Sequence, residues 1–222
     1  MKDDMVGGAV TVSARRIGLI ADIHCEAADG SDLPDAVFAA LHDVDLVIDL
    51  GHTGTPDDPC RGVLDRLEKL APVLAVRDFY VGPDGRPFAT PPEPGRVDGL
   101  VRIVEVNGVR IGAVHNLERD PGPSIPTPPG GLPELAGLAV RDAVTAKFGG
   151  PVDIVAYGGT HRPAALVADG VLFVNPGSPT YPKGPGRPAG QRALGTVGVL
   201  TVDPGAVSFE TVDLQLWESA DA

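Results

Sequence analysis

Three aliphatic runs near the start of the sequence constrain its fold most strongly, because segments with helical spacing separate them. The runs cover residues 17–21, 44–50 and 72–76. Continuous aliphatic runs of this length are typical of strands that are buried on both faces of a parallel sheet. Between them, residues 31–41 and 60–70 carry apolar side chains at the spacing of an amphipathic helix. The order strand, helix, strand, helix, strand predicts an α/β fold with parallel strands and right-handed crossovers.

Each of the three runs ends in side chains that can bind a metal ion. Asp22 and His24 follow the first run, His52 follows the second and Asp78 the third. In doubly wound sheets the functional residues gather beyond the carboxyl ends of the strands. Taken alone, the first pair favours a polar strand end, in which Asp22 caps a helix and His24 lies on the surface. Because carboxylates and neutral imidazoles are typical ligands of transition metals, the repetition at several strand ends favours a metal site.

Hairpins dominate the rest of the chain. Asn-Gly at 107–108 separates two β-rich runs, which is the strongest short sequence signal for a hairpin. The second run ends at His115, and Asp-Gly at 169–170 and Asp-Pro-Gly at 203–205 predict two further hairpins. A strand over 152–157 precedes His161.

Two helix boundaries follow from local signals. Ser31 or Asp32 is a possible cap for the first helix, and Pro34 suits its first turn. A later helix is expected over about 135–148. Its inward-facing residues would be Ala139, Val140, Ala143 and Val144.

Composition limits the class of protein. The hydrophobic fraction of 43% supports a sizeable core, and no apolar run approaches the roughly 20 residues of a membrane-spanning helix. The net charge of −12 argues against binding to a nucleic-acid polymer, which needs Lys and Arg to neutralise phosphates. Cys25 and Cys60 are too few for a disulfide scaffold. We expect a cytoplasmic protein with no membrane association.

One domain is expected over residues 1–222, with no linker and no internal repeat. Residues 1–14 predict a loose tail, although 9–12 could add a strand to a sheet edge. Residues 82–99 predict an exposed loop, and the proline-rich segment 120–133 predicts a lid or a long surface loop.

In chain order, five short stretches form a pattern: Asp22-Ile23-His24, Gly51-His52, Arg77-Asp78-Phe79, Val114-His115-Asn116 and Gly158-Gly159-Thr160-His161. This pattern resembles the motifs of the calcineurin-like metallophosphoesterases, especially the small bacterial and archaeal phosphodiesterases. The resemblance extends over about residues 16–211 and includes Asn175-Pro176-Gly177-Ser178. It implies a four-layer α/β/β/α sandwich of two mixed β-sheets.

Three positions depart from the family pattern. Members hold two divalent metals, which are bridged by an aspartate that is His52 here. The asparagine ligand of the second metal falls at Phe79, and a further histidine ligand at Gly159. A neutral imidazole offers one lone pair, so His52 cannot bridge two ions as a carboxylate does. Asp78 could partly replace the missing asparagine.

The resemblance therefore implies one divalent transition metal, Mn²⁺, Fe²⁺ or Zn²⁺, rather than two. Its ligands would be Asp22, His24 and His161, with His52 as a fourth and with Asp78 and His115 as further candidates. Asp49 would lie behind these ligands and orient an imidazole.

The function that follows is hydrolysis of a small phosphate ester, with His115 and His52 as candidate catalytic residues. Arg77 or Arg162 could stabilise developing charge or could be ordinary surface residues. The alternatives are a catalytically inactive scaffold that binds a protein partner, and another metal-dependent reaction. A homo-oligomer is possible. His42, which matches no motif, is expected to be a plain surface residue.

Overall fold

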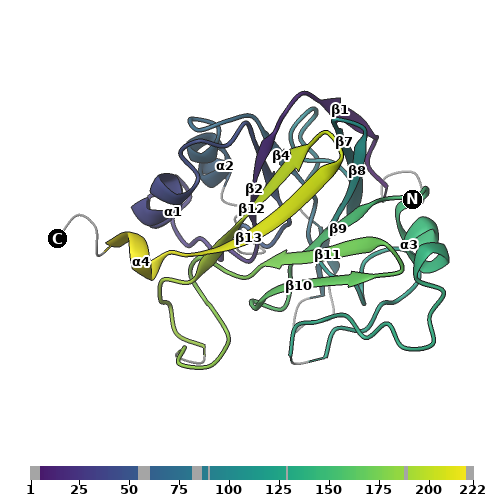
Figure 1. The fold of residues 1–222 in the computed structure, drawn as a ribbon. Coiled ribbons are helices and arrows are strands. Elements are labelled where there is room, and N and C mark those ends of the chain that lie inside the picture. The colour runs from purple at the N-terminus through teal and green to yellow at the C-terminus, as the bar shows by residue number, and fades with distance from the viewer. Residues whose placement is uncertain are drawn as a thin grey trace.

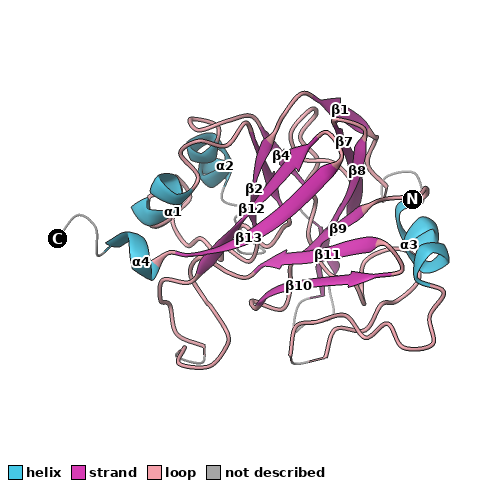
Figure 2. Ribbon diagram, in the orientation of Figure 1, coloured by secondary structure: helices cyan, strands magenta, loops and turns pink. Residues whose placement is uncertain are grey.

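The computed structural model describes residues 6–54, 61–81, 87–89, 91–128, 130–187 and 190–218. Two mixed β-sheets pack face to face, and helices cover their outer faces (Figures 1 and 2). The predicted four-layer sandwich is thereby confirmed. Within the described ranges, no helix is long and apolar enough to cross a bilayer.

The five-stranded sheet contains the three parallel strands that the first aliphatic runs predict. Its strand order is β13-β12-β2-β3-β4. β2 pairs in parallel with β3, and β3 with β4, whereas β12 is antiparallel to both β2 and β13. The bounds of its strands and of the two helices that join the parallel strands are β2 (Arg16–Ile20), α1 (Asp35–Ala40), β3 (Leu46–Asp49), α2 (Arg61–Leu67), β4 (Val73–Ala75), β12 (Thr196–Asp203) and β13 (Ala206–Asp213).

The six-stranded sheet has the order β1-β7-β8-β9-β11-β10 and carries α3 on its outer face. A separate two-stranded sheet is formed by β5 and β6, and the short helix α4 lies near α1 at the other end of the molecule (Figure 1). The bounds are β1 (Val10–Val12), β5 (Phe79–Val81), β6 (Pro87–Ala89), β7 (Val101–Val106), β8 (Val109–Val114), α3 (Val140–Phe148), β9 (Ile154–Tyr157), β10 (Pro163–Ala168), β11 (Val171–Pro176) and α4 (Gln215–Glu218).

Alternation along the strands divides the apolar side chains into three cores. Ile17 and Leu19 of β2 face the other sheet, whereas Ile20 faces α1 and α2. The inter-sheet core also takes Ile111 and Ile154 from the six-stranded sheet. Because side chains on a strand point to opposite faces in turn, one buried strand supplies two layers of the sandwich.

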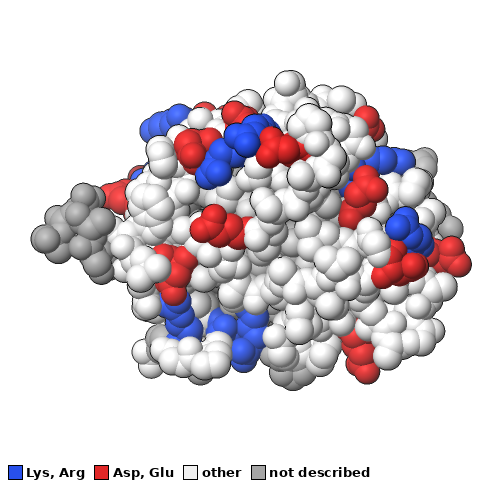
Figure 3. Space-filling model, in the orientation of Figure 1, with Lys and Arg blue, Asp and Glu red and all other residues white. Residues whose placement is uncertain are grey.

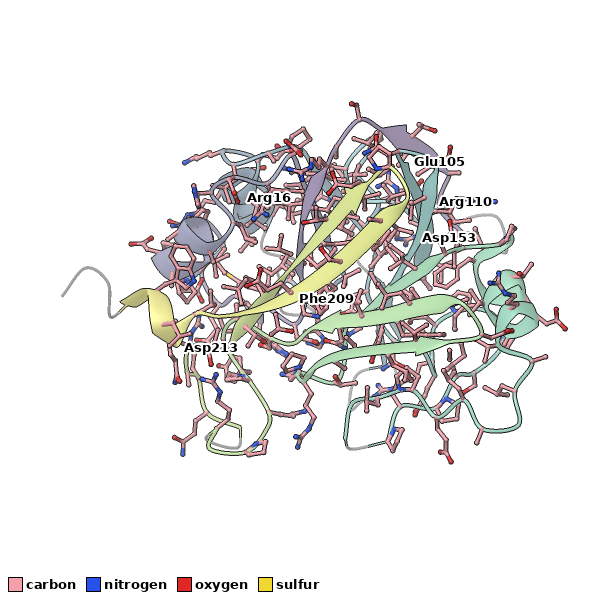
Figure 4. All side chains as sticks on the ribbon, viewed as in Figure 1. Arg16, Glu105, Arg110, Asp153, Phe209 and Asp213 are labelled. Atoms are coloured by element: carbon pink, nitrogen blue, oxygen red, sulfur yellow. The ribbon has the colours of Figure 1, made fainter. Side chains whose placement is uncertain are left out.

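Close packing between strands depends on small residues at some positions. Phe209 of β13 packs against the inter-sheet core (Figure 4) and lies over Gly198 of the neighbouring strand. A Cβ at residue 198 would come within 2.6 Å of the Phe209 ring. Figure 4 also shows Arg110 next to Asp153, whose Oδ2 accepts the Arg110 backbone N–H at 2.9 Å.

The predicted hairpins are confirmed by pairing and by backbone angles. β7 pairs with β8, β10 with β11 and β12 with β13, all antiparallel. Asn107 and Gly108 have φ values of 52° and 80°, and Asp169 and Gly170 have 48° and 71°. Two successive positive φ values are the mark of a type I′ turn, for which Asn-Gly and Asp-Gly are preferred.

Two expectations about irregular segments are wrong. Residues 6–14 are not a loose tail, and the alternative that residues 9–12 add a strand to a sheet edge is confirmed. β1 pairs in parallel with β7 at the edge of the six-stranded sheet, and the Gly7 N–H donates to Val101 O at 2.8 Å. The segment 82–99 is not simply an exposed loop. β6 lies within it and pairs with β5, and Val97 is buried; residues 82–86 and 90 lie outside the described part.

The helix starts also differ from expectation. α1 has no side-chain cap: Asp32 instead accepts the Glu26 N–H at 2.9 Å and forms an ion pair with Arg192. α3 begins at Val140, which leaves Ala139 exposed as its N-cap and Ala143 only partly buried. Buried Lys147 and Phe148 complete its inner face. The Lys147 ammonium is tolerated there because it donates to the carbonyls of Asp120 and Pro121, each at 3.0 Å.

Acidic and basic side chains are interspersed on the face drawn in Figure 3. Several are paired across loops, as Arg15 is with Asp203 at 2.6 Å. No extended basic stripe crosses the described residues of this face. That a nucleic-acid polymer is not a partner remains a prediction.

Candidate metal centre

Left-handed backbone marks the residues that the sequence singles out. Asp22, His24, His52 and His161 have φ values of 54°, 48°, 58° and 60°. Non-glycine residues rarely adopt this conformation, which costs of order 1–3 kcal/mol and persists only where the surrounding structure enforces it. The other non-glycine residues with positive φ in the described chain, Asn107 and Asp169, lie in the hairpin turns. Backbone strain is therefore concentrated at the candidate centre.

The loops after β2 and β3 are held together by backbone hydrogen bonds. Asp22 N–H donates to Gly51 O at 3.0 Å, and His24 N–H donates to His52 O at 3.1 Å. These bonds bring His24 and His52 side by side, with ring centroids 4.1 Å apart. Adjacent parallel strands end at the same edge of the sheet, so residues far apart in sequence meet there.

Asp49 supports this loop, but not in the predicted way. Its buried carboxylate accepts the Gly51 N–H at 3.0 Å and the Thr53 hydroxyl at 2.5 Å. Burial raises the pKa of Asp49 to about 6, against the lowering effect of those hydrogen bonds. The expectation that Asp49 orients an imidazole is corrected: it shapes the loop that carries His52.

Two separations between ligand atoms of the first group match those that a metal ion requires. His161 Nε2 lies 3.2 Å from His24 Nε2 and 3.5 Å from Asp22 Oδ1. Ligand atoms about 2.1 Å from a tetrahedral ion lie roughly 3.4 Å from one another. His52 also offers a nitrogen within 4.8 Å of ligand atoms of Asp22 and His24.

Contacts behind two imidazoles select the nitrogen that faces the centre. His161 Nδ1 lies 2.8 Å from Tyr181 O, and His115 Nδ1 lies 2.9 Å from Leu50 O. A carbonyl oxygen can only accept, so in each ring Nδ1 carries the proton and Nε2 faces the ligand atoms. Such outer contacts are typical of metal-binding histidines.

Asp22 carries the observation that most favours a bound cation. Its Oδ2 accepts the Gly159 N–H at 2.8 Å, but its buried Oδ1 has no hydrogen-bond partner among the described residues. Burial would raise the pKa of Asp22, but His115 and His161 outweigh it and lower that pKa. A buried carboxylate oxygen that points at imidazole nitrogens and lacks a donor fits a site for a divalent transition metal.

The imidazoles of His24 and His52 also fit a metal ion. Burial, followed by the neighbouring His52, lowers the pKa of His24 to about 3. Burial, followed by His115, lowers the pKa of His52. Both rings are therefore neutral at physiological pH and keep a lone pair for a cation.

A second group consists of His52, Asp78 and His115, whose ligand atoms lie within 4.8 Å of one another. Asp78 Oδ2 is 3.3 Å from His52 Nδ1, and Asp78 Oδ1 is 4.0 Å from His115 Nε2. Burial would lower the pKa of His115, but Asp78 and Asp22 outweigh it and raise that pKa to about 9. The two groups share His52, which occupies the position where the family pattern has a bridging aspartate.

The structure thus brings together all six predicted ligands, Asp22, His24, His52, Asp78, His115 and His161. A cavity of about 190 Å³ opens onto five of them and is completed by Asn116, Arg119 and Gly159. Sequence reasoning missed Asn116 and Arg119. Asn116 could have been found, because asparagine forms turns and this one directly follows His115 at a strand end. Cys60 and the Phe79 side chain lie outside the described residues, and His42 is exposed as expected.

Comparison with known proteins agrees with this geometry. The family model described as the calcineurin-like phosphoesterase superfamily domain matches residues 16–205. The chain belongs to this superfamily.

Two similar proteins are archaeal. A probable metallophosphoesterase of Methanothermobacter thermautotrophicus is 30% identical over 170 residues, which are 75% of this chain and 78% of that protein. Another, from Methanocaldococcus jannaschii, is 31% identical over 173 residues, or 76% and 70% of the two chains. Among solved structures, a Vps29 of Entamoeba histolytica complexed with Zn²⁺ shares the fold. Its TM-score is 0.52 at 19% identity, and the match covers 90% of this chain and 99% of that one.

Proposed function

We propose that this calcineurin-like phosphoesterase is a hydrolase of small phosphate esters, of the phosphodiesterase kind, that works with one divalent ion. Asp22, His24 and His161 would hold the ion, with His52 as a fourth ligand. The unpartnered, buried Oδ1 of Asp22 carries this proposal. Bound there, Mn²⁺, Fe²⁺ or Zn²⁺ supplies Lewis-acid activation of water and of the phosphoryl group.

Asp78 is assigned a supporting role. Its Oδ2 faces His52 Nδ1 at 3.3 Å, so a proton on Nδ1 would be held by Asp78 and the lone pair would be on Nε2. In this arrangement His52 serves one ion as a terminal ligand, and Asp78 fixes the orientation of its ring.

His115 is the proposed general acid or phosphate contact. It is 6% exposed and lines the cavity, where its Nε2 lies 3.8 Å from Asp22 Oδ1. Nδ1 is held by Leu50 O, so Nε2 is the nitrogen that can give a proton to the leaving ester oxygen or donate to the phosphate. Arg119, which lines the same cavity, is placed to contact a phosphate oxygen.

Metal content tests the proposal directly. Protein purified without added metal should contain about one ion per chain and should cleave a phosphodiester with Mn²⁺, Zn²⁺ or Fe²⁺. His161→Ala should lose both, whereas His42→Ala should lose neither, because His42 is exposed, with a hydrogen bond to Ala39 and a ring contact with Trp217. Two ions per chain would instead assign the second group as a metal site.

The substitutions at His52, Phe79 and Gly159 favour one other role, a metallophosphoesterase fold that binds a partner without catalysis. Protein that holds no ion and turns over no phosphodiester with any of the three metals would support that role.

A further inference from the structure

A second cavity lies beside the metal centre. Its volume is about 270 Å³, and it shares Asn116, Arg119 and Gly159 with the first cavity. A molecule bound at the metal centre could therefore extend past these residues into the second cavity.

Three cations line this second cavity, Arg119, Arg162 and Lys183. None of the three forms an ion pair with a described residue, whereas Arg15, Arg96 and most other arginines of the described chain do. One carboxylate is present, that of Glu118, and its Oε1 accepts the Thr127 N–H at 2.6 Å. In a chain of net charge −12, three cations without carboxylate partners around one cavity point to an anionic ligand.

The segments that carry these cations are tied to the metal ligands. Arg162 directly follows His161, and its N–H donates to the Thr160 hydroxyl at 3.2 Å. Lys183 N–H donates to His161 O at 2.9 Å. On the other side, Asn116 Oδ1 accepts the Arg119 N–H at 3.0 Å. The second cavity is therefore held at a defined place relative to the centre.

Gly159 keeps the two cavities joined. It has a φ of 76°, and a Cβ there would come within 3.2 Å of Asn116 Nδ2 and 3.3 Å of His115 O. A side chain at this position would thus occupy the junction. The family pattern has a histidine here, whereas glycine in this chain leaves the junction without a side chain.

We propose that the second cavity binds a second, non-scissile phosphate group, so that the substrate is a phosphate ester with at least two phosphates. The first phosphate lies at the metal centre, and the second is held by Arg162 and Lys183, with Arg119 between the two. Arginine suits this role because its guanidinium can bind phosphate oxygens through two parallel hydrogen bonds. Only the placement of the first phosphate rests on the proposed function. The second cavity exists in the protein without metal.

Binding without metal tests the cavity separately from catalysis. Inorganic pyrophosphate is titrated calorimetrically into protein stripped of metal, with inorganic phosphate as the shorter probe. Pyrophosphate should bind more tightly, and the Arg162→Gln/Lys183→Gln double variant should weaken it about tenfold or more, since charge-assisted hydrogen bonds are lost. The exposed Lys69, absent from the linings of both cavities, supplies the control Lys69→Gln, which should bind as the wild type does. Equal binding by the double variant and the control would overturn the proposal.

Substrate preference gives the second readout. With metal added, kcat/KM is compared for a bisphosphorylated ester and its monophosphorylated analogue. Arg162→Gln should lower the ratio of the two values about tenfold. An unchanged ratio, with both values reduced alike, would assign Arg162 to the scissile phosphate and overturn the second site. If no ester is cleaved but pyrophosphate binding still depends on Arg162 and Lys183, the proposed hydrolase is refuted and the anion site stands.

Discussion

The two ligand groups of the centre differ in how they are built. Asp22, His24 and His161 all have left-handed backbone and match the family pattern in type and order. In the other group, His52 and Asp78 stand where other residues are expected, and Asp78 faces two imidazoles. The difference teaches that left-handed backbone is shared by the three preserved ligands and by His52, but not by Asp78 or His115. His52 belongs to both groups, and its φ of 58° places it with the strained one.

The largest expected effect is that of Asp22→Asn. It removes the charge of the oxygen that lacks a partner and leaves the fold's hydrogen bond from Gly159 to Oδ2 possible. The affinity for the metal ion should fall at least about 100-fold, which is more than the loss of a residue that only supports a ligand. Turnover should disappear. Equilibrium dialysis with Zn²⁺ measures it. Retention of wild-type affinity would show that the strained group is not the metal site.

Asp49 should contribute strongly to the acid-range pH dependence of stability in the metal-free protein. Its pKa rises from 3.8 to about 6 on folding, so the native state binds the extra proton between these values. The contribution of Asp49 to the free energy of unfolding is therefore greatest below about pH 4. It falls by about 3 kcal/mol as the pH rises through 6. Asp49→Asn should remove that part of the pH dependence.

Urea unfolding at pH 4.5 and pH 7, with a chelator present, measures the difference between wild type and Asp49→Asn. Asp120→Asn is the matched comparison, because burial also raises the pKa of Asp120 to about 6. Its Oδ2 accepts the Asn116 N–H, whereas Asp49 accepts the Gly51 N–H, so Asp120→Asn should change stability while the loop that carries His52 stays in place. If only Asp49→Asn loses metal affinity, the loop that carries His52 contributes to metal binding by Asp22, His24 and His161.

Asp78→Asn should have a smaller effect on the metal. If Asp78 orients His52, its loss lowers affinity about tenfold while the stoichiometry stays at one ion. The measurement is metal content at saturating and limiting Mn²⁺. A drop from two ions to one would show that Asp78 is a ligand of a second metal, and that both ligand groups bind ions.

Gly159→Ala should have the smallest effect. A Cβ in left-handed backbone costs about 1–2 kcal/mol, and this one also approaches Asn116 closely. The melting temperature should fall by a few degrees while metal affinity stays near wild type. Unchanged stability would mean that the junction between the cavities can hold a side chain.

Much of the fold was accessible from sequence because its signals are local. Aliphatic runs, helical spacing and Asn-Gly or Asp-Gly turns predicted the parallel strands β2, β3 and β4 and the three hairpins. The sequence could not decide whether the N-terminal residues form a loose tail or an edge strand, because β1 is stabilised by a partner about ninety residues away, which no local pattern reveals. The absent cap on α1 has a similar cause: Asp32 is engaged by Glu26 and Arg192.

By itself the sequence determined which residue types stand at the strand ends, and thus the identity of all six candidate ligands. Only the tertiary structure decided their arrangement: which oxygen of Asp22 lacks a partner, that His52 lies between two groups, and that Asp49 supports a loop. It also decided that Arg119, Arg162 and Lys183 line one cavity beside the centre. The physical reason is that side-chain identity is encoded locally, whereas distance, burial and charge compensation depend on segments brought together by two packed sheets.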